Sequence, residues 1–215
     1  MEKSHKVFNL IILDESGSMV SIKTPTINGF NEVIQTVKGI ELQFPEQEHL
    51  ISFVTFNGLG IKTHLFNEPV NKINPIDERN YKPDANTPLY DAMGFSITKL
   101  RAVSENYENY NVLVTILTDG EENASREYNG AAIKKLVEEL KLKGWTFTYI
   151  GANHDVDSFA DSLSIKNKMN YMANEADVKR MWAKENSSRV NFSKKIRNKE
   201  NVSEDYYEDD NKENK

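Results

Sequence analysis

The sequence predicts an α/β protein with a mostly parallel central sheet and helices on both of its faces. Strand-like apolar runs alternate along residues 1–175 with segments whose apolar residues recur at helical spacing. The clearest run, residues 111–117 (NVLVTIL), is uncharged and rich in β-branched residues, as in a strand buried on both faces of a parallel sheet. No segment repeats internally, which favours one ordinary domain over a repeat array.

The expected elements follow in chain order. Strands are expected at residues 6–13, 50–56, 61–66, 111–117 and 145–150. The second and third are joined by Asn57-Gly58, a turn signal typical of a hairpin. Helices are expected at residues 25–42, 89–103, 131–142 and 156–163. Because ligands of such sheets bind beyond the carboxyl ends of the strands, a functional site is expected in the loops after Leu13 and Leu117.

Composition excludes several kinds of chemistry. The chain has no cysteine, which excludes disulfides, thiolate metal sites and a cysteine nucleophile. Its four histidines are scattered without metal-ligand spacing, so a metal site has to use oxygen ligands. No apolar run approaches the roughly eighteen residues of a membrane span, and no export signal is recognisable. We therefore expect no membrane contact and a cytoplasmic location.

Charge divides the chain into three parts. Residues 176–199 hold eight basic against two acidic residues, and residues 200–215 hold seven acidic residues against two lysines. We expect a folded domain over 1–175, a basic and helical segment over 176–197, and an acidic disordered tail over 198–215. Val178, Met181 and Trp182 form an apolar stripe at helical spacing, which favours packing of the segment on the domain. Nucleic-acid or membrane binding by its lysines and arginines is the alternative, and the acidic tail argues against it.

Small oxygen-bearing side chains gather where ligands are expected. Asp14, Ser16 and Ser18 follow the first strand in the motif DESGSM, and Gly17 permits a tight turn there. Thr87 precedes a helix in TPLYDA, and Asp119 follows the central strand in TDG. Two carboxylates with hydroxyls, and no nitrogen or sulfur partner, suit Mg²⁺, Mn²⁺ or Ca²⁺.

These motifs, in this order and spacing, resemble the metal-ion-dependent adhesion site of von Willebrand factor A (vWA) domains. The resemblance covers roughly residues 5–175 and implies a doubly wound sheet with one antiparallel edge strand, supplied by the hairpin. It implies that one divalent cation is surrounded by Asp14, Ser16, Ser18, Thr87 and Asp119, and that an Asp or Glu of a protein partner completes its coordination. The forms DESGSM, TPLYDA and TDGEEN resemble the bacterial and phage intracellular branch, which includes tellurite-resistance-associated proteins.

Two other functions stay open at this point. A Mg²⁺-dependent phosphoryl-transfer or hydrolytic enzyme would use Asp14 as nucleophile, but Ser16 stands where such enzymes need a second acid, and no Walker-type loop is present. A regulatory subunit of an ATPase complex is the binding module placed in a particular setting. Among neighbouring acids, Asp91 is expected to be structural in the first turn of its helix, and Glu15 and Glu121 are expected to face solvent.

Overall fold

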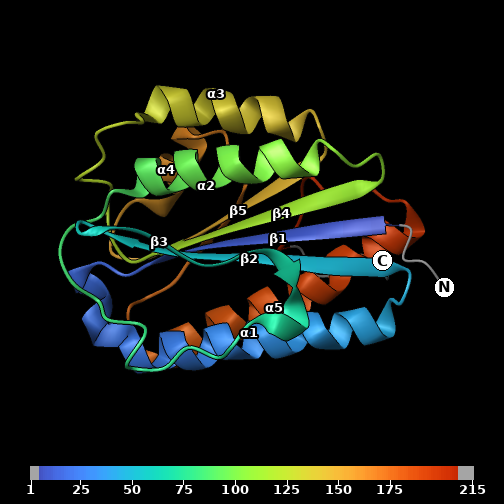
Figure 1. Cartoon of the computed structure of the whole chain (residues 1–215). Helices are drawn as coiled ribbons and strands as arrows, with labels where there is room; N and C mark the ends of the chain where they lie inside the picture. The colour runs from blue at the N-terminus through green and yellow to red at the C-terminus, as the bar shows by residue number, and fades with distance from the viewer. Residues whose placement is uncertain (1–4, 208–215) are drawn as a thin grey trace, which may run out of the picture.

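The computed structural model describes residues 5–207 and confirms the α/β fold (Figure 1). Six strands form one sheet in the order β3-β2-β1-β4-β5-β6. Every neighbouring pair is parallel except β2 and β3, which form the antiparallel hairpin at one edge. The strands are β1 (His5–Asp14), β2 (Gln47–Asn57), β3 (Gly60–Pro69), β4 (Tyr110–Thr118), β5 (Trp145–Gly151) and β6 (Asn167–Asn170).

Five α-helices cover the two faces of the sheet (Figure 1). They are α1 (Lys23–Gln43), α2 (Leu89–Ser104), α3 (Gly130–Lys141), α4 (Val156–Ser162) and α5 (Glu175–Asn198), with short 3₁₀ turns η1 (Gly17–Ile22) and η2 (Val70–Lys72). Helices α2, α3 and α4 share one apolar core with the sheet, and α1 and α5 share the other. Strand β1 serves both cores because alternate residues point to opposite faces: Ile12 enters the first and Ile11 the second.

Local signals fix where several helices begin. Asn129, Asp155 and Asn174 each precede a helix, and each side-chain oxygen accepts a backbone N–H from the first turn of α3, α4 or α5. These caps satisfy amides that have no partner inside the helix. Helix starts after the parallel strands are therefore set by the loops at the carboxyl edge of the sheet, next to the expected site.

Helix α5 lies beyond the domain boundary expected at residue 175, and it packs on the domain as its apolar stripe predicts. Val178, Met181 and Trp182 are buried in the core shared with α1. Trp182 contacts Gly29 of α1, where a Cβ would come within 1.9 Å of the indole ring. The close approach of the two helices therefore depends on glycine at position 29.

The segment that follows α5 differs from the disordered tail expected from residue 198 onward. Val202 and Tyr206 are buried, and the Val202 carbonyl accepts a hydrogen bond of 2.8 Å from Thr146 Oγ1. Residues 200–207, which we call the C-terminal strap, thus pack on the α5 face of the sheet. The segment is acidic in composition, which predicts disorder. It also contains three apolar or aromatic side chains that anchor it, namely Val202, Tyr206 and Tyr207. The rest of the expected tail, 208–215, lies outside the described residues.

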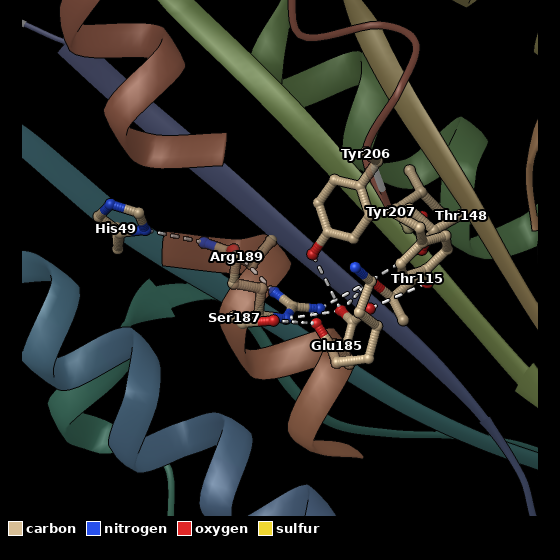
Figure 2. A network of polar contacts seen from close by, with 11 residues as sticks. His49, Thr115, Thr148, Glu185, Ser187, Arg189, Tyr206 and Tyr207 are labelled. Atoms are coloured by element: carbon tan, nitrogen blue, oxygen red, sulfur yellow. Dashed lines mark hydrogen bonds and ion pairs between the residues drawn. The ribbon is translucent and has the colours of Figure 1, made fainter. Parts of the chain in front are cut away.

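Beneath the strap, a fully buried ion pair joins α5 to the sheet (Figure 2). Arg189 Nε lies 2.8 Å from Glu185 Oε1, and Arg189 Nη2 donates to Thr115 Oγ1 on β4. The hydroxyls of Tyr206 and Tyr207 donate to the two oxygens of Glu185, at 3.1 and 2.9 Å. The buried charges of α5 are therefore compensated by each other, by the sheet and by the strap.

Candidate metal centre

Three segments that are far apart in the sequence meet at the carboxyl edge of the sheet. Asp14 is the last residue of β1, Thr87 lies two residues before α2, and Asp119 directly follows β4. A Cβ on Gly120 would lie 3.6 Å from Ser18 Oγ and 3.7 Å from Thr87 Oγ1, so these hydroxyls border the same small space. The remaining residues of the predicted set are Asp14, Ser16 and Asp119. Hydrogen bonds join them to Ser18 directly or through one another.

The first carboxylate, Asp14, is fully buried. Its Oδ1 accepts the backbone N–H of Ser16 at 2.7 Å, and its Oδ2 accepts the hydroxyl of Thr118 at 2.5 Å. Burial raises the pKa of Asp14 to about 6, although both hydrogen bonds act in the opposite direction. Thr118 orients this carboxylate and was not singled out from the sequence; it lies next to Asp14 because the preceding residues, Leu13 and Leu117, are paired across β1 and β4.

The second carboxylate, Asp119, is 1% exposed. Ser18 Oγ donates to its Oδ1 at 2.5 Å, and Ser18 Oγ lies 3.2 Å from Ser16 Oγ. Its Oδ2 is buried and has no hydrogen-bond partner within residues 5–207. Burial raises the pKa of Asp119 as well, because the charged form loses hydration without a full replacement.

The donor set fits a hard divalent cation. In the described part of the chain, neither Asp14 nor Asp119 forms an ion pair, and the charge of His154 only partly offsets the effect of burial on the pKa of Asp119. Carboxylates are costly to bury unless a cation or a proton compensates them. Within the same residues, no group of three or more His, Asp or Glu side chains is arranged to hold a metal, so an ion here would rely on hydroxyl oxygens.

A loop from the region between β3 and α2 supports the β1 end of the site. Tyr81 is buried and its hydroxyl donates to the backbone carbonyl of Asp14 at 2.6 Å. Glu15, which we expected to face solvent, is buried instead and its Oε1 accepts the N–H of Lys82 at 2.5 Å. That expectation was wrong because the loop folds over Glu15 and supplies a backbone donor, which local sequence does not reveal. Glu121 is exposed, as expected.

A second layer of polar side chains fixes the loop after β4. Asp91 accepts three backbone N–H groups from residues 126–128, at 2.8 to 2.9 Å, which confirms a structural role. Asn123 Oδ1 accepts the N–H of Thr87, and Asn123 N–H donates to the Thr87 carbonyl. Glu122 accepts the N–H of Tyr90. The motif TDGEEN therefore contributes one site carboxylate and two residues that tie its loop to Thr87 and α2.

Comparison with known proteins decides the family. The sequence profile of the von Willebrand factor type A domain matches residues 10–191. The chain belongs to this family. The match extends over most of α5, so the basic helix is part of the vWA region in this chain. No curated protein matches the whole sequence significantly.

Solved structures share the vWA fold at low sequence identity. The SpRpn10 vWA domain is 9% identical with a TM-score of 0.55, over 83% of this chain and 94% of that one. The vWF domain of the type V pili tip protein Mfa5 from Porphyromonas gingivalis is 10% identical with a TM-score of 0.52, over 86% and 96%. Proximal thread matrix protein 1 of the mussel byssus is 12% identical with a TM-score of 0.54, and this chain spans 46% of its length. At these identities the similarity establishes the fold.

Within residues 5–207 no helix is long and apolar enough to cross a membrane. The basic side chains of α5 are in part engaged on the surface: Lys179 pairs with Glu175, and Arg197 pairs with Glu46. The polar and acidic groups at the carboxyl edge are therefore the main candidates for function in this vWA domain.

Proposed function

We propose that this vWA domain is a cation-dependent protein-binding module without catalysis of its own. The observation that carries the proposal is the pair of buried carboxylates without an ion pair in the described part of the chain, of which Asp119 accepts the Ser18 hydroxyl on Oδ1 and has no hydrogen-bond partner on Oδ2. One Mg²⁺, Mn²⁺ or Ca²⁺ would be held by Asp14, Ser16, Ser18, Thr87 and Asp119. The family membership supports a role in protein-protein interaction.

The charge of such a centre explains why it would recruit an acidic group. Hydroxyls are neutral ligands, so at most Asp14 and Asp119 would bring negative charge to the ion, and a coordination position filled by water would stay open to an external anion. An Asp or Glu carboxylate of a protein partner is the proposed ligand. The hairpin tip at residues 57–60 and the loop at 84–88 border the site and would contribute specificity. The forms DESGSM and TPLYDA are the basis for proposing a bacterial or phage intracellular complex as the setting, with an ATPase partner among the candidates.

The geometry offers less support for the alternative of an aspartyl-phosphate enzyme. Both oxygens of Asp14 accept hydrogen bonds, which lowers their availability for attack on phosphorus. In the described part of the chain, the side-chain partners of Asp14 and Asp119 are hydroxyls rather than the lysine or arginine that a phosphoryl-transfer site would use to neutralise a phosphate.

Calorimetric titration of Mg²⁺, Mn²⁺ and Ca²⁺ into metal-stripped protein tests the ion site. We expect about one ion per chain, and a melting temperature that rises with ion concentration; occupancy at a hundredfold excess over Kd stabilises a fold by about 2.7 kcal/mol. Asp14→Ala should lose both effects while remaining folded. Glu108→Ala, an exposed acid before β4 at the opposite edge of the sheet, should behave like the wild type. Absence of saturable binding by folded wild-type protein would refute the proposal.

Water-proton relaxation of the Mn²⁺ complex tests the open coordination position. Addition of acetate, as a minimal carboxylate, should displace a bound water and reduce the relaxation enhancement. The same addition of a neutral amide such as acetamide serves as the control and should leave it unchanged. An equal response to both compounds would contradict recruitment of a carboxylate.

A further inference from the structure

Tyr171 has a buried hydroxyl without a hydrogen-bond partner in the described structure. The residue directly follows β6, and its backbone N–H donates to the carbonyl of Gly151 at the end of β5. Its side chain is 5% exposed and belongs to the core between the sheet and the α1 and α5 helices. An unpaired phenolic hydroxyl in such a core is unfavourable, because it loses its bonds to water without replacement.

Strand register brings Tyr171 level with Asp119. Thr118, Gly151 and Asn170 are paired side by side across β4, β5 and β6. The residues that directly follow β4, β5 and β6 are Asp119, Ala152 and Tyr171. Tyr171 and Asp119 therefore follow strands that are separated by one strand, β5. Adjacent strands are about 4.8 Å apart, which puts the two Cα atoms about 10 Å from each other. Ala152 and Tyr171 are buried in the same core, and Asp119 is the acid with the largest electrostatic effect on the Tyr171 hydroxyl.

The two unpaired groups are chemically complementary. Tyr171 offers an O–H donor, and Asp119 Oδ2 is an acceptor that is also buried without a partner. Burial raises the pKa of Tyr171 well above its usual value, and the negative charges of Asp119 and then Asp14 add to the effect. The phenol is therefore protonated and able to donate at neutral pH.

We propose that Tyr171 is a positioning residue of the cation site, whose hydroxyl donates to the Asp119 carboxylate when the ion is bound. The inference rests on the proposed function. A hydrogen bond from outside the coordination sphere would fix the orientation of the carboxylate and thereby raise its affinity for the ion. Without that hydrogen bond, the buried hydroxyl is destabilising.

Tyr171→Phe tests this assignment by comparing ion affinity with stability. We expect the Kd for Mn²⁺ to rise about tenfold, the lower end of the range for loss of an outer partner. The melting temperature of the metal-free variant should equal or exceed that of the wild type, since an unpaired buried hydroxyl has been removed. Tyr206→Phe is the matched control. Its hydroxyl bonds to Glu185, so it should melt at a lower temperature and bind Mn²⁺ with unchanged Kd.

The outcomes separate the inference from the function on which it rests. A wild-type protein that binds no Mn²⁺ overturns both. Binding by the wild type with an equal Kd for Tyr171→Phe overturns the assignment of Tyr171 alone. If the variant fails to fold, carbon NMR of tyrosine-labelled wild type gives a second measure: the ring resonances should include one that shifts with Mg²⁺ occupancy. Tyrosine spectra that are identical with and without bound Mg²⁺ also overturn the assignment.

Discussion

At the scale of single residues, the carboxylates of Asp14 and Asp119 reduce the stability of the metal-free fold, although the proposed function requires them. Each is buried at the carboxyl edge of the sheet, and burial raises the pKa of both acids. A fold that needed these side chains only for its own stability would gain from neutral residues of the same shape. The cation of the proposed function would compensate this charge.

Replacing one of the acids by its neutral isostere allows its effects on stability and on ion affinity to be measured separately. Asp119→Asn keeps the shape and the contact to Ser18 but removes a buried charge. We expect the metal-free variant to melt at the same or a higher temperature than the wild type. Its affinity for Mn²⁺ should fall by more than the roughly 10–100-fold typical of outer-sphere changes, because an inner ligand is lost. Thermal melting with and without Mn²⁺ measures both quantities, and a less stable metal-free variant with undiminished affinity would contradict the explanation.

His64 contributes to the dependence of stability on pH in the sense opposite to Asp14, whose raised pKa favours the folded state as the pH falls. His64 on β3 accepts or donates a 2.8 Å hydrogen bond with Thr55 and stacks on Phe53, and desolvation lowers its pKa to about 4. The unfolded chain, with a histidine pKa near 6.5, binds more protons between these two values. His64 therefore reduces stability as the pH falls from about 6.5 toward 4.

His64→Gln should remove this part of the acid sensitivity. Glutamine retains a polar group for Thr55 but does not titrate, so the loss of stability between pH 7 and pH 5 should be smaller than in the wild type. Urea unfolding at the two pH values measures the difference. His154→Gln provides a comparison at a histidine that bonds to Tyr149 and the Ala152 carbonyl. An unchanged pH dependence in His64→Gln would show that other groups cause it.

At the scale of elements, α5 illustrates what periodicity predicts and what it leaves out. The stripe of Val178, Met181 and Trp182 correctly predicts a helix packed on the domain. The buried pair of Glu185 and Arg189 is invisible to such a pattern, because both residues lie in a stretch that appears polar and solvated. Short β6 (Asn167–Asn170) was likewise missed, since its four residues form a strand through pairing with β5 rather than through an apolar run.

Loss of one partner of this ion pair should be strongly destabilising. Arg189→Met leaves the carboxylate of Glu185 buried with two tyrosine hydroxyls and no cation, and the expected cost is about 3–5 kcal/mol. Lys179→Met on the same helix breaks an exposed pair with Glu175 and should change the free energy of unfolding far less than Arg189→Met does. Urea denaturation of both variants gives the free energies of unfolding. Similar values for the two would show that the buried network contributes little.

At the scale of the whole molecule, the sequence was sufficient for the fold class, the helices and the hairpin edge. Apolar periodicity and turn signals are local properties, and the layers follow from them once alternation predicts a parallel sheet. The structure also brings together the five residues expected at the site, because their motifs lie at strand and helix ends on one edge. Thr118, Tyr81, Asn123 and Tyr171 were not foreseen as neighbours of the site. Their positions depend on register between strands and on the path of long loops, which local sequence does not encode.

The assembly of the site from three distant segments has a further consequence for local opening. Residues 14, 87 and 119 belong to loops that the backbone already joins, since Gly17 N–H donates to the Ala85 carbonyl and Asp84 N–H to the Glu15 carbonyl. A cation shared by these loops would have to be released before either amide could open to solvent. Hydrogen-deuterium exchange at Gly17 and Asp84 should therefore slow as the ion is added, whereas amides in the middle of α3 should not change. The exchange rates of these two amides would then report how much of the protein holds an ion, without any binding partner.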